Sequence, residues 1–285
     1  MLHKNIKQTI LKNKVPIIII ICILFNILII LNYITKINNP KQTFKQINPK
    51  VAFSQKINYY KPNKIKVKDI NPSVVSAKTI YLTFDDGPSA LTESILNILK
   101  EENIPATFFL TSRQIDKYSR LVKRMQEENH TVALHTSTHN YSYIYSQDEN
   151  YFNDLNQIRN QIYNITGHKS RIVRLPGGSS NTISRKYNLG IVTRITNKLT
   201  ENDYYYFDWN VDSNDASGQQ TKESIYNNVV HKIHNGTNIV LMHDLIDKRT
   251  TVEALPAIIK FAKENGYTFA KITKNTPQIH HHINN

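Results

Sequence analysis

From residue 78 onward, the apolar positions of the chain alternate between two spacings. Short apolar runs, typical of buried strands, are separated by longer stretches in which apolar residues recur every three or four positions, as on one face of a helix. Strands alternating with helices predict parallel β/α units and an α/β barrel. The expected strands are 79–84, 106–110, 131–134, 171–173, 204–211, 238–242 and 267–270, and the expected helices are 91–102, 120–129, 150–166, 180–189, 222–234 and 252–265.

Residues with chemically active or bulky side chains share one kind of place in this pattern. They lie in or just beyond the C-terminal ends of expected strands: Asp85, His135, Arg174, Trp209 and His243. In a β/α barrel these strand ends form one face, on which active sites are built. Residues with unrelated roles in the core or on the surface would have no reason to lie all at strand ends. The pattern therefore predicts a single site on that face.

The N-terminus has a different pattern. Residues 15–31 form an almost unbroken apolar run, close to the shortest length that spans a bilayer, and Lys4, Lys7, Lys12 and Lys14 precede it. This basic flank predicts that the N-terminus stays in the cytoplasm and that the rest of the chain is exported. A cleaved signal peptide is the alternative, but no small-x-small cleavage site follows the run. We expect an uncleaved single-pass anchor in the cell membrane.

These patterns divide the chain into five parts. They are a basic cytoplasmic tail at 1–14, a transmembrane anchor at 15–34, a basic extracellular linker at 35–77, a folded domain at 78–275 and a tail at 276–285. The last part contains three consecutive histidines at a polar terminus, and we expect it to be disordered.

The net charge of +14 is unevenly distributed. Residues 1–77 contain 13 lysines and one acidic residue, Asp69, and so hold +12 of that charge, which leaves +2 for residues 78–285. A nearly neutral domain lacks the basic surface of a nucleic-acid-binding protein, so we expect no nucleic-acid partner. We interpret the lysines of the linker as a solvated tether. The alternative is attraction to anionic lipid head groups or an anionic wall polymer.

Two short segments carry candidate metal ligands. The first is Asp85-Asp86-Gly87-Pro88, and the second is His135-Thr136-Ser137-Thr138-His139. One Asp and two His make a facial set of three ligands that leaves positions open for water and substrate. The other Asp is then free to act as a base. The only cysteine, Cys22, lies in the apolar run, so no thiolate takes part in the domain. Together these segments predict metal-assisted hydrolysis.

With these two motifs the chain resembles the polysaccharide deacetylases, the NodB-like carbohydrate esterases of family four, over about residues 78–275. The resemblance implies a distorted β/α barrel. It implies that Asp85 is the general base and that Asp86, His135 and His139 bind a divalent ion. Zinc is the first expectation for that ion, and Co²⁺, Ni²⁺ and Mn²⁺ are alternatives.

A third motif matches with one departure. The family pattern Arg-x-Pro-aromatic-Gly reads Arg174-Leu175-Pro176-Gly177-Gly178 here, so Gly177 replaces the aromatic residue. The resemblance implies that Arg174 pairs with Asp85 and keeps it ionised and oriented. It also implies that the backbone N–H of Gly177 stabilises the oxyanion. The departure keeps this donor but removes a wall of the substrate groove.

The fourth motif, Asp-x-x-Asp-Trp in the family, reads Asp212-Ser213-Asn214-Asp215-Ala216, with Ala216 in place of the Trp. The resemblance implies that Asp215 hydrogen-bonds the catalytic histidine, with Asp212 as the second candidate. Trp209 lies nearby in the sequence and could supply an apolar surface to the substrate.

The fifth motif is Leu241-Met242-His243. The resemblance implies that His243 is the general acid and that Leu241 lines the pocket for the acetyl methyl group. The implied reaction is N-deacetylation of an amino sugar, and the predicted anchor makes peptidoglycan strands the first candidate substrate. Alternatives are another exported glycan (poly-N-acetylglucosamine, chitin oligomers or acetylated xylan), a catalytically silent glycan-binding domain, and a zinc amidase that cuts stem peptides.

Overall fold

A parallel sheet forms the centre of residues 78–285, the part of the chain that this computed structural model describes. The predicted anchor and linker lie outside the described residues. Within 78–285, no helix has both the length and the apolar character needed to cross a bilayer. The strands are β1 (Lys78–Asp85), β2 (Thr107–Leu110), β3 (Thr131–Leu134), β4 (Ile172–Val173), β5 (Tyr205–Tyr206), β6 (Val211–Asp212), β7 (Gly236–His243) and β8 (Thr268–Phe269).

The sheet is an open half-barrel. Its strand order is β5-β4-β3-β2-β1-β7-β6, and β8 pairs with the first residues of β1. The described strands β5 and β6 stand at the two ends of this order and are not paired with each other. The predicted α/β fold of parallel strands is therefore confirmed, while the barrel remains open on one side.

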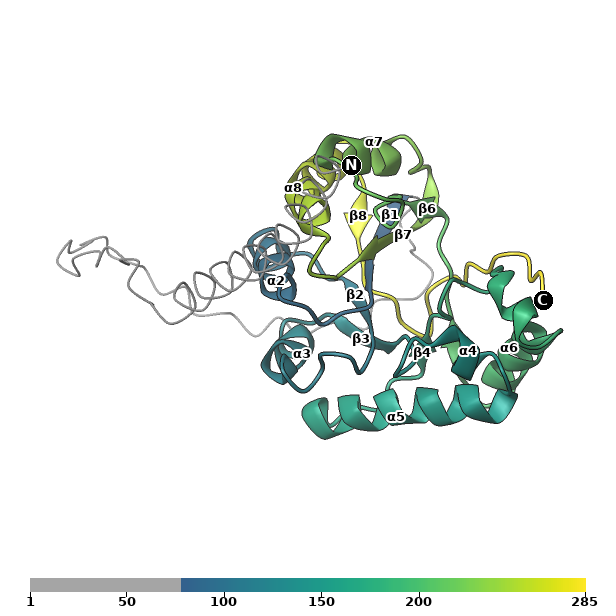
Figure 1. Cartoon of the computed structure of the whole chain (residues 1–285). Coiled ribbons are helices and arrows are strands. Elements are labelled where there is room, and N and C mark those ends of the chain that lie inside the picture. Colours follow the sequence, from purple (N-terminus) through teal and green to yellow (C-terminus); the bar gives the residue numbers. More distant parts are fainter. Residues whose placement is uncertain (1–77) are drawn as a thin grey trace, which may run out of the picture. The chain divides into compact units, whose positions relative to one another are not determined.

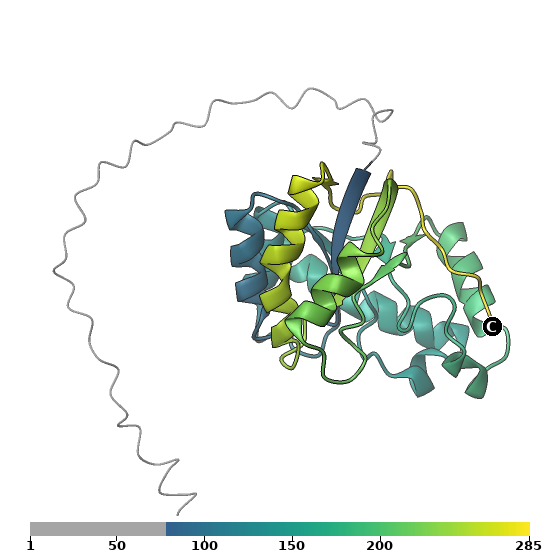
Figure 2. The same cartoon turned by 90° about the horizontal axis from the view of Figure 1, so that it is seen from above.

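Helices cover the sheet. Figure 1 shows α2 and α8 beside β1 and β2, with α7 next to α8, and the long α5 below β3 and β4. Figure 2 shows α2, α8 and α7 as a layer along the same side of the sheet. The helices are α2 (Thr92–Glu101), α3 (Ser119–Glu127), α4 (Tyr141–Ile144), α5 (Asp148–Thr166), the 3₁₀ helix η1 (Ile183–Lys186), α6 (Ile191–Glu201), α7 (Lys222–Val230) and α8 (Arg249–Glu264).

The central strand β1 is buried on both faces because successive side chains point to opposite sides of a strand. Ile80, Leu82 and Phe84 belong to the large apolar cluster that includes the helices. Tyr81 belongs to a smaller cluster on the other face of the sheet, with Phe109 of β2 among its members. Burial on both faces explains why this segment reads as an apolar run.

The strand register brings the predicted site residues together. In β1 and β7, Asp85 lies directly opposite His243. The strands β2, β3 and β4 follow on the other side of β1 in parallel register. His135 comes directly after β3, and Arg174 directly after β4. The C-terminal strand ends therefore form one face, as the sequence pattern predicts.

Four elements differ from the prediction, and one of them is the short helix α4, which was not expected. The strand expected at 204–211 is split into β5, which pairs with β4, and β6, which pairs with β7; between them the backbone N–H of Asp208 donates to Ile279 of the C-terminal tail. The helix expected at 180–189 is only the short 3₁₀ turn η1. Helix α6 was not predicted, since its sequence is rich in β-branched residues that favour strands. Its buried side chains nevertheless recur with helical spacing: Ile191, Val192, Ile195, Thr196 and Leu199.

The prediction of a disordered C-terminal tail is wrong. The ring of His280 stacks on Tyr206 with centroids 3.8 Å apart. The backbone N–H of His281 donates to Asp208, at 2.8 Å. The last residue accepts a hydrogen bond from the backbone of α6, and Figure 1 shows the yellow chain end beside that helix. Composition alone could not reveal these partners, because all of them are distant in the sequence.

Candidate active site

A cavity of about 300 Å³ opens at the C-terminal strand ends. Two of the predicted site residues, Arg174 and Asp215, are buried behind its wall. They are hydrogen-bonded to Asp85 and His243, which line the cavity. The other eight line it directly: Asp85, Asp86, His135, His139, Gly177, Trp209, Leu241 and His243. The structure thus gathers every predicted site residue at one place.

Three of these residues are arranged as metal ligands. One ligand atom each from Asp86, His135 and His139 lies within 4.8 Å of the other two. The Asp86 Oδ1 atom is 3.4 Å from His139 Nε2 and 3.7 Å from His135 Nε2. Two imidazoles and a carboxylate converging on one point are a donor set that suits a divalent transition metal. The residues present therefore fit such an ion.

Hydrogen bonding and burial prepare both imidazoles for this role. His135 Nδ1–H donates to the carbonyl oxygen of Arg174 at 2.8 Å, so the lone pair of Nε2 faces the cavity. Burial, together with the nearby His135, lowers the pKa of His139 to about 4. His139 is therefore neutral at neutral pH, as a metal-ligating imidazole must be.

The loops that carry the ligands have unusual backbones. Asp86, Thr136 and His139 all have left-handed conformations, with φ of 70°, 66° and 53°. Asp and His adopt this region more readily than most residues, although it is uncommon for any side chain other than glycine. The buried carboxylate of Asp154, on α5, accepts hydrogen bonds from the backbone N–H groups of Ser137 and Thr138. This acceptor stabilises the turn between the two histidines.

The second aspartate of the first motif is paired with an arginine. Asp85 Oδ1 accepts a hydrogen bond from Arg174 Nη1 at 2.8 Å, and both side chains are almost fully buried. The rest of the guanidinium donates to Thr83 Oγ1 and to the carbonyl oxygens of Phe207 and Asp208. With its donors occupied in this way, Arg174 holds the Asp85 carboxylate in a single orientation beside the metal ligands.

An imidazole–carboxylate pair lies on the other side of the cavity. His243 Nδ1–H donates to Asp215 Oδ1 at 2.7 Å, while Asp215 Oδ2 accepts from the His243 backbone N–H and from Thr251 Oγ1. Burial acts to lower the pKa of His243, but Asp215, Asp85 and Asp86 outweigh it and raise the pKa to about 9. Burial likewise opposes ionisation of Asp215, yet its hydrogen bonds with His243 and Thr251 bring its pKa below the ordinary value. His243 is thus a cationic acid at neutral pH.

The second candidate for this carboxylate, Asp212, has a different partner. Its Oδ1 accepts from the backbone N–H of Asn214 at 2.7 Å, and it lines the cavity without contacting His243. The choice of Asp215 is therefore the one that the geometry supports.

Gly177 has a left-handed backbone, with φ of 76°. A Cβ atom at this position would lie 2.6 Å from the hydroxyl oxygen of Tyr141. The next glycine also has a left-handed backbone, with φ of 75°, and a Cβ there would lie 3.0 Å from the Trp209 ring. Both glycines therefore suit a backbone that strains other residues, and Trp209 packs on the loop as well as lining the cavity.

Sequence reasoning missed several residues that build the site: Tyr141, Asp154, Asp208 and Thr251. For Tyr141 a signal exists, because it is an aromatic residue two positions after the second histidine ligand. The others act across long sequence separations, such as the 36 residues between Thr251 and Asp215. No local pattern identifies partners of that kind.

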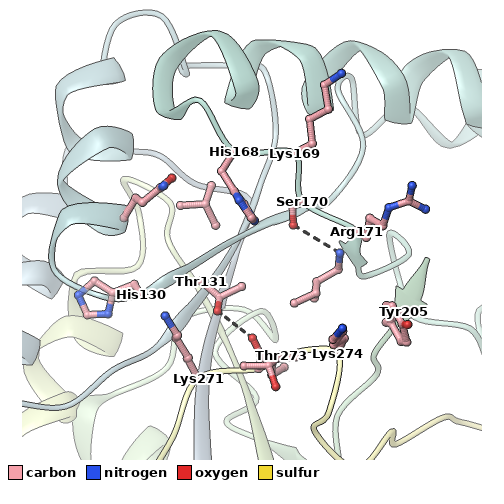
Figure 3. Close-up of a pocket in the computed structure, with 14 residues that line it drawn as sticks. His130, Thr131, His168, Lys169, Ser170, Arg171, Tyr205, Lys271, Thr273 and Lys274 are labelled. Carbon is pink, nitrogen blue, oxygen red and sulfur yellow. Dashed lines mark hydrogen bonds between the residues drawn. The ribbon is translucent and has the colours of Figure 1, made fainter. Parts of the chain in front are cut away.

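A larger cavity of about 450 Å³ lies at the opposite, N-terminal ends of β3, β4 and β5 (Figure 3). Its wall includes four Lys or Arg residues and no carboxylate. Two of its cations are already engaged, since Arg171 donates to the Asn202 carbonyl and Lys271 donates to Asn129. This cavity offers neither a ligand set nor an acid–base pair, so the chemistry is concentrated in the smaller one.

Comparison with known proteins agrees with this geometry. The family model described as "Polysaccharide deacetylase" matches residues 73–191. A peptidoglycan-N-acetylglucosamine deacetylase of Bacillus cereus is 35% identical over 197 residues, covering 67% of this chain and 68% of the relative. The peptidoglycan-N-acetylmuramic acid deacetylase PdaA of Bacillus subtilis is 29% identical over 197 residues, covering 68% and 70%.

Solved structures lead to the same family. The catalytic domain of a peptidoglycan N-acetylglucosamine deacetylase from Eubacterium rectale has a TM-score of 0.70 and 38% identity. The match covers 75% of this chain and 100% of that domain. The chain belongs to the polysaccharide deacetylase family, and its relatives named peptidoglycan deacetylases are hydrolases that act on amide bonds.

Proposed function

We propose that this protein is a metal-dependent N-deacetylase of the amino sugars of cell-wall peptidoglycan. One observation carries the proposal: Asp86, His135 and His139 converge between an Asp85–Arg174 pair and a His243–Asp215 pair in a single cavity. This provides a metal site with a base on one side and an acid on the other. The names of the relatives and of the solved domain support peptidoglycan as the substrate class.

The residues divide the reaction among them. A divalent ion held by Asp86, His135 and His139 would supply a Lewis acid and lower the pKa of a water molecule. Asp85, oriented by Arg174, accepts the proton of the attacking water. The backbone N–H of Gly177 donates to the oxygen of the amide carbonyl as negative charge develops there.

His243 completes the reaction. It is protonated at neutral pH, and its Nδ1–H is held by Asp215, which leaves Nε2–H to protonate the departing amine nitrogen. Leu241 lines the cavity as an apolar contact for the acetyl methyl group. The products are acetate and a sugar with a free amine.

Zinc is the metal that we propose, because a carboxylate and two imidazoles with open positions form a catalytic zinc site. Co²⁺, Ni²⁺ and Mn²⁺ accept the same ligand types. The metal prediction is tested by His139→Ala, which should lose most of the bound metal while the domain stays folded, because the site lies at the rim of the sheet.

We also propose a location for the reaction. The apolar run at 15–31 and its basic flank support a single-pass membrane anchor, with the catalytic domain on the outer side and peptidoglycan strands within reach. Cell fractionation tests this: the protein should stay with the membrane and keep its N-terminus. Recovery from the culture medium with a trimmed N-terminus would contradict it.

Product analysis on purified peptidoglycan tests the function. The full chain should release acetate and leave glucosamine or muramic acid with a free amine, which mass spectrometry of the digested glycan identifies. Release of stem peptide without acetate would indicate an amidase instead. Binding to the glycan with neither product would indicate a silent glycan-binding domain.

A further inference from the structure

The tip of Tyr141 occupies the place that a side chain on Gly177 would take. A Cβ built on Gly177 would lie 2.6 Å from the Tyr141 hydroxyl oxygen and 3.4 Å from the adjacent ring carbon. A side chain at position 177 would force the Tyr141 ring to move, and the left-handed backbone there strains any residue other than glycine. The groove wall that Gly177 cannot provide is therefore supplied from another element, the short helix α4 (Figure 1).

Contacts on both sides fix the position of this phenol ring. It meets the ring of His139 edge-on, with centroids 5.5 Å apart, and meets Tyr145 in the same way at 5.5 Å. The Tyr145 hydroxyl donates to the carbonyl oxygen of Pro176 at 2.7 Å, which anchors the loop that carries Gly177. Tyr141 thus stands between a metal ligand and the loop expected to hold the oxyanion donor.

The Tyr141 hydroxyl has no hydrogen-bond partner within residues 78–285, whereas Tyr145, one turn later in the chain, uses its hydroxyl for structure. Tyr141 also lines the cavity, and Tyr145 does not. A phenol hydroxyl can donate one hydrogen bond. A free donor at the wall of an active-site cavity, within a few ångströms of Gly177, is available to a substrate.

We propose that Tyr141 is a catalytic residue that donates a second hydrogen bond, beside that of the Gly177 N–H, to the amide carbonyl oxygen as it gains negative charge. Its ring forms the adjacent wall of the sugar site. This inference rests on the proposed deacetylase function, and it assigns part of the transition-state stabilisation to the Tyr141 hydroxyl. It also accounts for the occurrence of Gly177 beside Tyr141, since the Tyr141 hydroxyl occupies the space that a Cβ at position 177 would take.

The variant Tyr141→Phe tests the proposal, because it removes the donor and keeps the ring. Tyr143→Phe is the matched control, since Tyr143 lies on the same helix and is 40% exposed. Both full-length variants are assayed for acetate release from purified peptidoglycan, and their metal content and Tm are measured. We expect kcat of Tyr141→Phe to fall about 100-fold, with KM changed by less than about threefold. Metal content, Tm and the control should match the unmodified protein.

Other results would overturn it. A kcat within twofold of the unmodified protein would remove the catalytic role. A raised KM at unchanged kcat would make the hydroxyl a ground-state sugar contact. Loss of metal or a lowered Tm would make Tyr141 a support for His139 alone. If the unmodified protein itself releases no acetate, the proposed function fails, and this inference, which rests on it, fails as well.

Discussion

Replacing Asp215 by Asn should move the alkaline limb of the activity profile to lower pH. Asp215 contributes most to keeping His243 protonated, through a 2.7 Å hydrogen bond and its charge, against the opposing effect of burial. The pKa of His243 rises from 6.5 to about 9. Since one pKa unit is worth about 1.4 kcal/mol, the environment favours the protonated imidazole by about 3 kcal/mol. A cation held by Asp86 would oppose the contributions of Asp85 and Asp86, whereas the hydrogen bond with Asp215 would remain.

The assay is kcat/KM for acetate release between pH 5 and about 10, which reports the ionisation of the free enzyme. Asp212→Asn is the matched control, because Asp212 lines the same cavity without touching His243. We expect the limb to shift in Asp215→Asn and to stay in place in Asp212→Asn. An alkaline limb that coincides in all three proteins would refute the assignment of His243 as the acid.

The pH dependence of the unfolding free energy should also depend on the His243–Asp215 pair. The folded pKa of His243 lies above its ordinary value, so its contribution is fully present below about pH 6.5 and is lost as the pH rises through about 9. The lowered pKa of Asp215 adds stability that is lost as the solution becomes acidic. The difference in unfolding free energy between the unmodified protein and Asp215→Asn should therefore shrink above pH 9.

Three further predictions concern the support of the site. Arg174→Met should lower the unfolding free energy in urea by about 3–5 kcal/mol, because it leaves the buried Asp85 carboxylate without its partner; a loss below about 1 kcal/mol would contradict this. Removing residues 277–285 should lower Tm and kcat together, because this tail forms hydrogen bonds with Ser180, Asp208 and Trp209, next to the Gly177 loop. Unchanged values would show that the tail supports neither stability nor the site. Gly177→Ala should destabilise the unmodified protein more than the Tyr141→Phe variant, by about 1 kcal/mol, because only the former places a hydroxyl 2.6 Å from the new Cβ; additive effects would contradict the contact.

The sequence predicted the strand ends because burial on both faces makes parallel strands readable as apolar runs. Asp85, His135, Arg174 and His243 follow such runs, so their meeting at one face could be inferred before the structure was known. The candidate metal ligands and acid–base residues could be inferred from short motifs that are present in this chain with the expected spacing. The structure places all of them around one cavity.

The rest could not be read from local patterns. The break between β5 and β6 contains Asp208, whose carboxylate accepts hydrogen bonds from Ser179 and from the C-terminal tail. The replacement of an aromatic residue by Gly177 predicts the loss of a groove wall, but the phenol of Tyr141 reaches the same place from a different element. Contacts of this kind join segments that are distant in the sequence, so they can be identified only from the three-dimensional structure.

Asp85→Asn offers the most direct test of the central claim, that Asp85 acts as the base beside a metal held by its neighbours. The substitution keeps the shape of the side chain and leaves Asp86, His135 and His139 in place, but the amide cannot accept the proton of the attacking water. Metal content and acetate release from peptidoglycan should be measured on the same sample. The account predicts metal content equal to that of the unmodified protein and a rate lowered by at least about 100-fold. Full metal content with an unchanged rate of acetate release would contradict it.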